Sequence, residues 1–232
     1  MKLLNLSVLI GIGVFSATAA PKTSPKISVE VLAIEFPPYT TSKLETDGIA
    51  FEKLRAHPAM SEIEVTAKFT PPTRIGKRLL LRDWCMSFYP PRDQKGGQFK
   101  KWEISKEEVK LGFYRVKQDG EFTWGSLSEL KGHSVGLLSS YSKKGLSGLM
   151  YANALDVYAI DSLEQGFDLL VKNRIDLVFS DKYSGQFIAI DHGYDLQELQ
   201  FSDTALSTER FHVWVNLSCT QLVTQLEPHW AQ

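Results

Sequence analysis

The sequence has little cysteine and no clustered histidine. Its 232 residues include two cysteines, Cys85 and Cys219, which lie far apart in the chain. Two such residues cannot build a Cys-rich metal site. The five histidines are scattered, and none of them forms the HxH or HExxH spacing of a metal-ligand pair. We therefore expect no metal site and no cofactor.

Motifs of nucleotide binding and of nucleophilic catalysis are missing as well. The chain contains no GxGxxG and no GxxxxGK[ST] segment. The segment Gly145-Leu146-Ser147-Gly148 lacks the GxSxG spacing of a nucleophile elbow. The paired carboxylates Glu107 and Glu108 lie in a charged run, which is typical of a solvated surface. No catalytic residue is nominated, and we expect a protein that is not an enzyme.

Neither sign of charge dominates the chain. There are 26 Lys and Arg residues against 27 Asp and Glu residues, for a net charge of −1. Such a balance gives no bulk reason to bind nucleic acid or an anionic membrane surface. Hydrophobic residues make up 43% of the sequence, which is enough to build a real core. The composition indicates a globular protein that binds no nucleic acid.

One long apolar run is present, and it lies at the start of the chain. Met1-Lys2 precedes an almost wholly apolar stretch, Leu3 to Phe15, and Ala17-Thr18-Ala19 has the spacing of a signal peptidase site. A membrane anchor is the alternative, but the run is shorter than the ~20 residues that span a bilayer. We expect residues 1–19 to be a cleaved signal peptide and the mature protein to be periplasmic. Export to an oxidising compartment permits a disulfide between Cys85 and Cys219, with two buried thiols as the alternative.

Strand-like and helical segments alternate through the rest of the chain. Ile27–Ile34 and Ile63–Phe69 are rich in β-branched residues, as strands are. Between such segments, apolar residues recur at helical spacing, for example in the stretch Leu163–Val171. The alternation predicts an α/β fold with mostly parallel sheets, and it runs twice along the chain. We therefore expect two α/β lobes.

Several segments together resemble bacterial extracellular solute-binding proteins of family 3, the periplasmic amino-acid-binding components of ABC transporters. The resemblance covers most of residues 27–216, and its segments are Glu35-Phe36-Pro37-Pro38-Tyr39, Gly48-Ile49-Ala50-Phe51-Glu52, Pro72-Thr73-Arg74, Leu130-Lys131-Gly132-His133-Ser134-Val135-Gly136, and Asn173-Arg174-Ile175-Asp176 with Leu177-Val178-Phe179-Ser180-Asp181. Each segment is weak evidence alone, and their order and spacing carry the likeness.

The resemblance implies the type II periplasmic binding-protein fold. In that fold each lobe is a mostly parallel sheet flanked by helices, and two hinge strands join the lobes. It implies a first lobe of residues 27–110 plus 207–232 and a second lobe of residues 111–206. The hinge strands would lie near residues 109–116 and 206–211. Both cysteines then belong to the first lobe, which favours their pairing.

The resemblance also implies a ligand site between the lobes. Phe36 and Tyr39 match the aromatic loop that contacts the ligand side chain, although Phe36 could equally be core and Tyr39 merely exposed. Asp181 matches the acid that binds an α-ammonium group, and an ordinary helix N-cap is the alternative. Ser140 and Ser142 match the turn that offers hydroxyl and amide groups to a carboxylate, and simple capping is the alternative.

The partner of a ligand carboxylate is less defined. The family places a bidentate arginine there, and Arg92 is the residue that matches. Its segment departs from the family pattern because Tyr89 stands where the family has Ser or Thr. Arg74 is the second candidate. The alternatives are a surface ion pair of Arg92 with Asp93 and a solvated position for Arg74.

These observations predict a monomeric periplasmic receptor. It would trap a small polar solute, an amino acid or a related compound, between its lobes and deliver it to an ABC permease. One alternative is a sensory or orphan ligand-binding module without a permease. Another is an enzyme, dehydratase-like, on the same scaffold, because fold does not fix function.

Overall fold

The computed structural model describes residues 27–81, 83–91, 97–139 and 145–230. The predicted signal peptide, residues 1–19, lies outside these ranges, as do three predicted site residues: Arg92, Ser140 and Ser142. Within the described ranges, no helix has both the length and the apolar character that crossing a bilayer requires.

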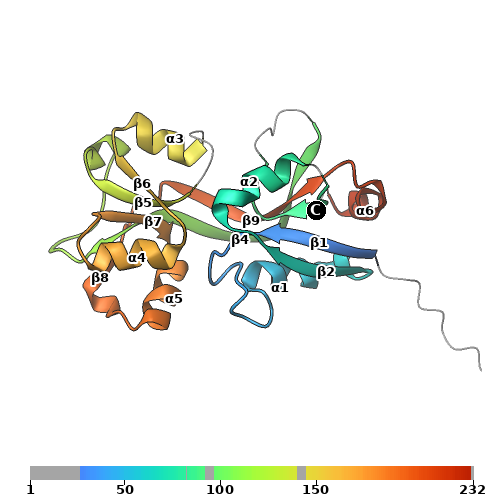
Figure 1. The fold of residues 1–232 in the computed structure, drawn as a ribbon, viewed down its shortest axis with the longest axis horizontal. Helices are drawn as coiled ribbons and strands as arrows, with labels where there is room; N and C mark the ends of the chain where they lie inside the picture. Colours follow the sequence, from blue (N-terminus) through green and yellow to red (C-terminus); the bar gives the residue numbers. More distant parts are fainter. Residues whose placement is uncertain (1–26, 82, 92–96, 140–144, 231–232) are drawn as a thin grey trace, which may run out of the picture.

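Helices and strands alternate along the chain, as Figure 1 shows. The first half contains β1 (Ile27–Ala33), α1 (Ile49–Ala56), β2 (Ile63–Phe69), α2 (Pro72–Leu80), β3 (Met86–Ser87) and β4 (Phe99–Val116). The second half contains β5 (Ser134–Leu138), α3 (Gly145–Ala152), β6 (Asp156–Ile160), α4 (Leu163–Val171), β7 (Leu177–Asp181), α5 (Lys182–His192), β8 (Leu199–Phe201), β9 (Ser207–Asn216) and α6 (Thr220–Leu226). Short 3-10 turns lie at Pro58–Met60, Leu127–Leu130, Leu196–Glu198 and Glu227–His229.

The strands follow the order β2-β1-β3-β9-β4-β7-β5-β6, with β8 paired to β4. β1 is parallel to β2 and β3, and β5 is parallel to β6 and β7. The two central strands, β4 and β9, are antiparallel to each other. In Figure 1 they run side by side between one lobe with α1, α2 and α6 and another with α3, α4 and α5. The predicted α/β architecture of two lobes joined by two strands is confirmed.

The connecting strand β4 is longer than the predicted stretch, residues 109–116. Its first part pairs with β9 from Phe99, opposite Asn216, and its last part pairs with β7 at Leu111, opposite Asp181. One continuous strand therefore belongs to both lobes. Because β4 has no break that marks a boundary, the lobe boundaries near residues 110 and 206 stay predictions.

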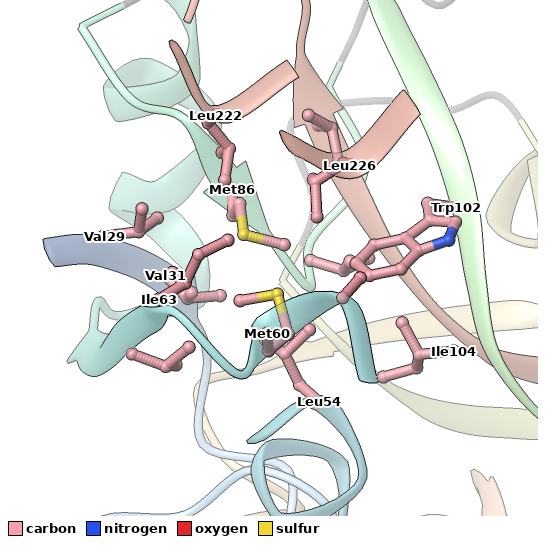
Figure 2. Packing of buried hydrophobic residues seen from close by; sticks show 14 of the residues in the cluster. Val29, Val31, Leu54, Met60, Ile63, Met86, Trp102, Ile104, Leu222 and Leu226 are labelled. Atoms are coloured by element: carbon pink, nitrogen blue, oxygen red, sulfur yellow. The ribbon is translucent and has the colours of Figure 1, made fainter. Parts of the chain in front are cut away.

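A buried apolar cluster holds the first lobe together. Figure 2 shows Met60 and Met86 between Val31 and Trp102, and all four side chains are nearly inaccessible to solvent. Residues from β9 and α6, which come last in the chain, complete the cluster. The C-terminal segment therefore returns to the lobe that the N-terminal strands begin.

Cys85 and Cys219 form a disulfide, as the predicted pairing allowed. Cys85 immediately precedes β3, and Cys219 is the N-cap residue of α6. Both side chains pack against the cluster of the first lobe. The bond thus ties the C-terminal helix to the edge of that core.

The second lobe has a core on each face of its sheet. Phe113 and Tyr114 are neighbours on β4, so their side chains point to opposite faces. Phe113 packs with Val135 and Met150, whereas Tyr114 packs with Phe167. A sheet covered on both faces explains why β7 is almost wholly buried.

Candidate functional site

The loop of residues 35–48, between β1 and α1, places Tyr39. The first amide groups of α1 anchor it: the Ile49 N–H donates to the Pro38 carbonyl (3.0 Å), and the Ala50 N–H donates to the Tyr39 carbonyl (2.9 Å). These amides would otherwise lack partners at the helix start. Gly48 has φ of 100°, and a Cβ there would lie 2.5 Å from the Tyr39 carbonyl oxygen. The loop therefore needs glycine at position 48.

Replacing Gly48 by Ala is expected to lower the free energy of unfolding by about 2–4 kcal/mol, because the backbone is strained and the carbonyl must move. Gly120→Ala is the matched control. Gly120 also has positive φ, 85°, but a Cβ there would meet nothing within 4 Å. Chemical denaturation of both variants measures the difference. Equal losses would show that close approach to Tyr39 is not what requires Gly48.

Asp181 is the last residue of β7 and the N-cap of α5. Its Oδ1 accepts hydrogen bonds from the amide groups of Tyr183 (2.9 Å) and Ser184 (3.0 Å). The residue is 1% exposed. Asp181 therefore does cap α5, as the capping alternative proposed, and it uses one of its two oxygens to do so.

Tyr39 and Asp181 meet across the two lobes. The Tyr39 hydroxyl donates a hydrogen bond of 2.8 Å to Asp181 Oδ1, although 142 positions separate the two residues. Burial and the neighbouring carboxylate raise the pKa of Tyr39, so its hydroxyl stays protonated and acts as a donor. Burial and the same carboxylate also raise the pKa of Tyr114. Among the described residues, Asp181 Oδ2 is buried without a hydrogen-bond partner.

Two cavities adjoin this contact. One has a volume of about 330 Å³, and the other about 480 Å³. Tyr39, Val109 and Phe211 line both, so these side chains stand between the two spaces. The Tyr39 ring lies 5.5 Å from the Phe211 ring and 6.1 Å from the Phe36 ring. The larger cavity is also lined by Tyr183 and Phe187 from α5, so Tyr39 lies beside a space between the lobes. The ligand-binding role of the aromatic loop stays a prediction.

Further contacts of the 35–48 loop reach the second lobe. Phe36 packs against the core cluster that contains Tyr114 and Phe167. Lys43 Nζ lies 2.9 Å from an oxygen of Asp191 and 3.4 Å from one of Glu164. Hydrogen bonding to Asp191 is the largest cause that raises the pKa of Lys43. The two lobes are thus in direct contact in this structure, through polar and apolar side chains.

Arg74 lies apart from the described cavities. It is exposed on α2, whose buried side is formed by Ile75 and Leu79. It is not among the described residues that line either space. The structure thus brings together Phe36, Tyr39 and Asp181 but not Arg74, and the roles proposed for all of them stay predictions. Arg92, Ser140 and Ser142 lie outside the described residues.

The connecting strands supply lining residues that the sequence did not nominate. Val109 and Leu111 come from β4, and Phe211 comes from β9. The pairing of β4 with β9 shifts between Glu103 and Glu108, and Phe211 is the β9 residue between their partners. The predicted hinge strands were a signal for these residues, because strands that join two lobes must line the space between the lobes.

Charged groups around the cavities are largely paired. Glu107 pairs with Lys53 (2.5 Å), Glu108 with Arg210 (3.5 Å), and Glu209 with Lys101 (3.1 Å). In the described part of the chain, no Lys, Arg or His forms an ion pair with Asp181, and no cluster of acids, histidines or cysteines could hold a metal ion. The donors that Asp181 contacts among the described residues are therefore all neutral.

No family model matches the sequence. The comparison with curated proteins finds no match either. Solved structures do match over nearly the whole chain. An ancestral arginine-binding protein bound to arginine has a TM-score of 0.66 at 17% identity, covering 90% of this chain and 92% of that one.

Two further solved structures are similar. The ligand-binding core of GluR0 from Nostoc punctiforme, in complex with L-glutamate, has a TM-score of 0.63 at 14% identity and covers 87% of this chain and 93% of its own. A histidine kinase sensor domain with similarity to periplasmic binding proteins has a TM-score of 0.67 at 15% identity, with 89% and 90% covered. At these identities the likeness shows the fold: that of two-lobe periplasmic binding proteins.

Proposed function

We propose that this protein is a receptor that traps a small polar solute, an amino acid or a related compound, between its two lobes. One observation carries the proposal: Asp181, a buried carboxylate that forms no ion pair with a described residue, contacts Tyr39, and Tyr39 lines both cavities beside the connecting strands. A buried charge normally has an opposite charge beside it. A ligand ammonium group would provide it, and separation of the lobes would let the ligand enter.

We further propose that the chain is a member of solute-binding family 3, is exported to the periplasm as a monomer, and delivers its ligand to an ABC permease. The order of the family-like segments and the apolar N-terminal run support this. The names of similar solved structures mention arginine, glutamate and glutamine as bound molecules, which agrees with an amino-acid-like ligand.

A thermal-shift screen of amino acids, amines and carboxylates tests the binding function. A ligand that binds only the folded state stabilises it by RT ln(1 + [L]/Kd), which is about 2.7 kcal/mol at 100 times Kd. For a chain of this length such a gain raises Tm by roughly 5–10 °C. A cooperatively unfolding protein that none of these compounds stabilises would contradict the proposal.

A sensory module without a permease is the second candidate. The similarity to a histidine kinase sensor domain favours it, with a TM-score of 0.67. The neighbouring genes separate the two roles. Permease and ATPase genes beside this one would support import, whereas a sensor kinase gene in their place would support signalling.

The proposal assigns binding without chemistry. The arginine-binding proteins among the similar solved structures are named for binding, which supports this point. Mass spectrometry of the ligand after long incubation with the protein checks this point. Recovery of the unchanged compound is expected, and a converted product would support the dehydratase-like alternative.

A further inference from the structure

The two oxygens of Asp181 have unequal surroundings. Oδ1 accepts hydrogen bonds from the Tyr39 hydroxyl and from two amide groups at the start of α5. Oδ2 is buried and, among the described residues, has no partner. Buried polar atoms are nearly always hydrogen-bonded, and a buried charge left unpaired is costly. No residue in the described part of the chain therefore supplies a positive charge to the Asp181 carboxylate.

The walls of the smaller cavity, which Tyr39 lines, are mostly aromatic and aliphatic. Its volume of about 330 Å³ lies at the lower end of the range of ligand pockets, ~300–1,000 Å³. Its apolar lining includes Phe36, Phe88, Tyr89, Val109, Leu111 and Phe211. A small apolar body fits such walls, and aromatic faces also attract a cation.

A ligand carboxylate would meet no free cation among the described lining residues. Arg210 already pairs with Glu103 and Glu108. Burial is the main cause that lowers the pKa of His212, so this imidazole is neutral at pH 7. Glu209, in the same lining, pairs with Lys101, so that lysine is not free to bind a carboxylate either. The described charges therefore suit a cation better than a zwitterion.

Resting on the proposed function, we infer that the site takes a small organic monocation, a primary amine on an aromatic or aliphatic body, whose ammonium group replaces the Tyr39 hydroxyl on Asp181. The hydroxyl occupies the position of a ligand donor, 2.8 Å from Oδ1. An ammonium group brings the charge that the neutral hydroxyl lacks. The tyrosine hydrogen bond already ends on a carboxylate and is charge-assisted, so what favours the exchange is the added attraction between two opposite charges in a buried site. Tyr39 is thus an internal competitor for the ligand site.

Isothermal titration of the full chain with three compounds of one shape tests the ligand class: phenethylamine, L-phenylalanine and 3-phenylpropionate. Isoamylamine, L-leucine and 4-methylpentanoate form an aliphatic set. In at least one set we expect the amine to bind 10-fold or more tightly than the amino acid, and the acid not to bind. An amino acid that binds more tightly than its amine would overturn the inference and would point to a carboxylate partner outside the described residues, Arg92 first.

The outcomes separate this inference from the proposed function. If neither amine binds but the wider thermal-shift screen finds another stabilising solute, the inference is overturned and the receptor function stands. If no compound of that screen binds to the folded protein, both are overturned.

Tyr39→Phe tests the competition directly. This variant removes the hydroxyl and keeps the ring, so the amine should bind about 5- to 10-fold more tightly, the size of one net hydrogen bond. Tyr194→Phe is the control, because the Tyr194 hydroxyl donates to Asp168, away from the cavities. Equal or weaker amine binding by Tyr39→Phe, compared with the control, would overturn the displacement of Tyr39.

Discussion

Replacing Asp181 by Asn is expected to weaken ligand binding by a factor of about 100 or more, while the unliganded protein stays as stable as before. Asn has the same shape and caps a helix as well as Asp does, so α5 should begin normally. It lacks the charge that an ammonium group requires. Removing one member of a buried charge pair costs about 3–5 kcal/mol, which corresponds to this loss of affinity. Titration calorimetry and thermal unfolding of the same variant measure both effects.

Asp195→Asn is the matched control for this experiment. Asp195 caps the 3-10 turn Leu196–Glu198 by accepting from the Gln197 amide, and it is exposed. The same chemical change there should leave affinity within a factor of two. Wild-type affinity in Asp181→Asn, or an equal loss in both variants, would refute the role of the Asp181 charge.

Removing the disulfide has the second large expected effect. The double variant Cys85→Ser, Cys219→Ser should lose about 2–5 kcal/mol of unfolding free energy, because the bond closes a loop of 134 residues in the unfolded chain. For a protein of this length, Tm should fall by roughly 10 °C. Binding at low temperature should persist, since both cysteines pack in the first-lobe core and neither lines the described cavities.

Thermal unfolding with and without reductant gives an independent measurement. The wild type should lose Tm on reduction, and the double variant should not respond. A wild-type protein whose Tm is insensitive to complete reduction would contradict the stabilising role of the bond. Free thiols in the protein purified without reductant would contradict the pairing itself.

Local patterns predicted most of the fold. Ile63–Phe69 is a strand with the predicted bounds, because alternating burial leaves its mark on consecutive residues. The helical spacing in Leu163–Val171 likewise corresponds to α4, whose bounds match it. The start of β4 at Phe99 was missed, because its first part is a charged strand whose partner, β9, comes about a hundred residues later.

The candidate site was only partly accessible to such reasoning. Family resemblance nominated Tyr39 and Asp181 separately, but no local signal joins residues 142 positions apart. Their contact depends on how the two lobes meet. Phe211 lies in the predicted hinge strand near residues 206–211, but its place beside the cavities depends on the shifted pairing of β4 with β9, which no local pattern shows.

A crystal structure of the protein grown with its strongest ligand from the thermal-shift screen is the most direct test of the whole account. We predict the solute in the space floored by β4 and β9, with its nitrogen about 3 Å from the Asp181 carboxylate and the Tyr39 hydroxyl moved away. A solute bound elsewhere on the surface, with the Tyr39–Asp181 hydrogen bond intact, would contradict it.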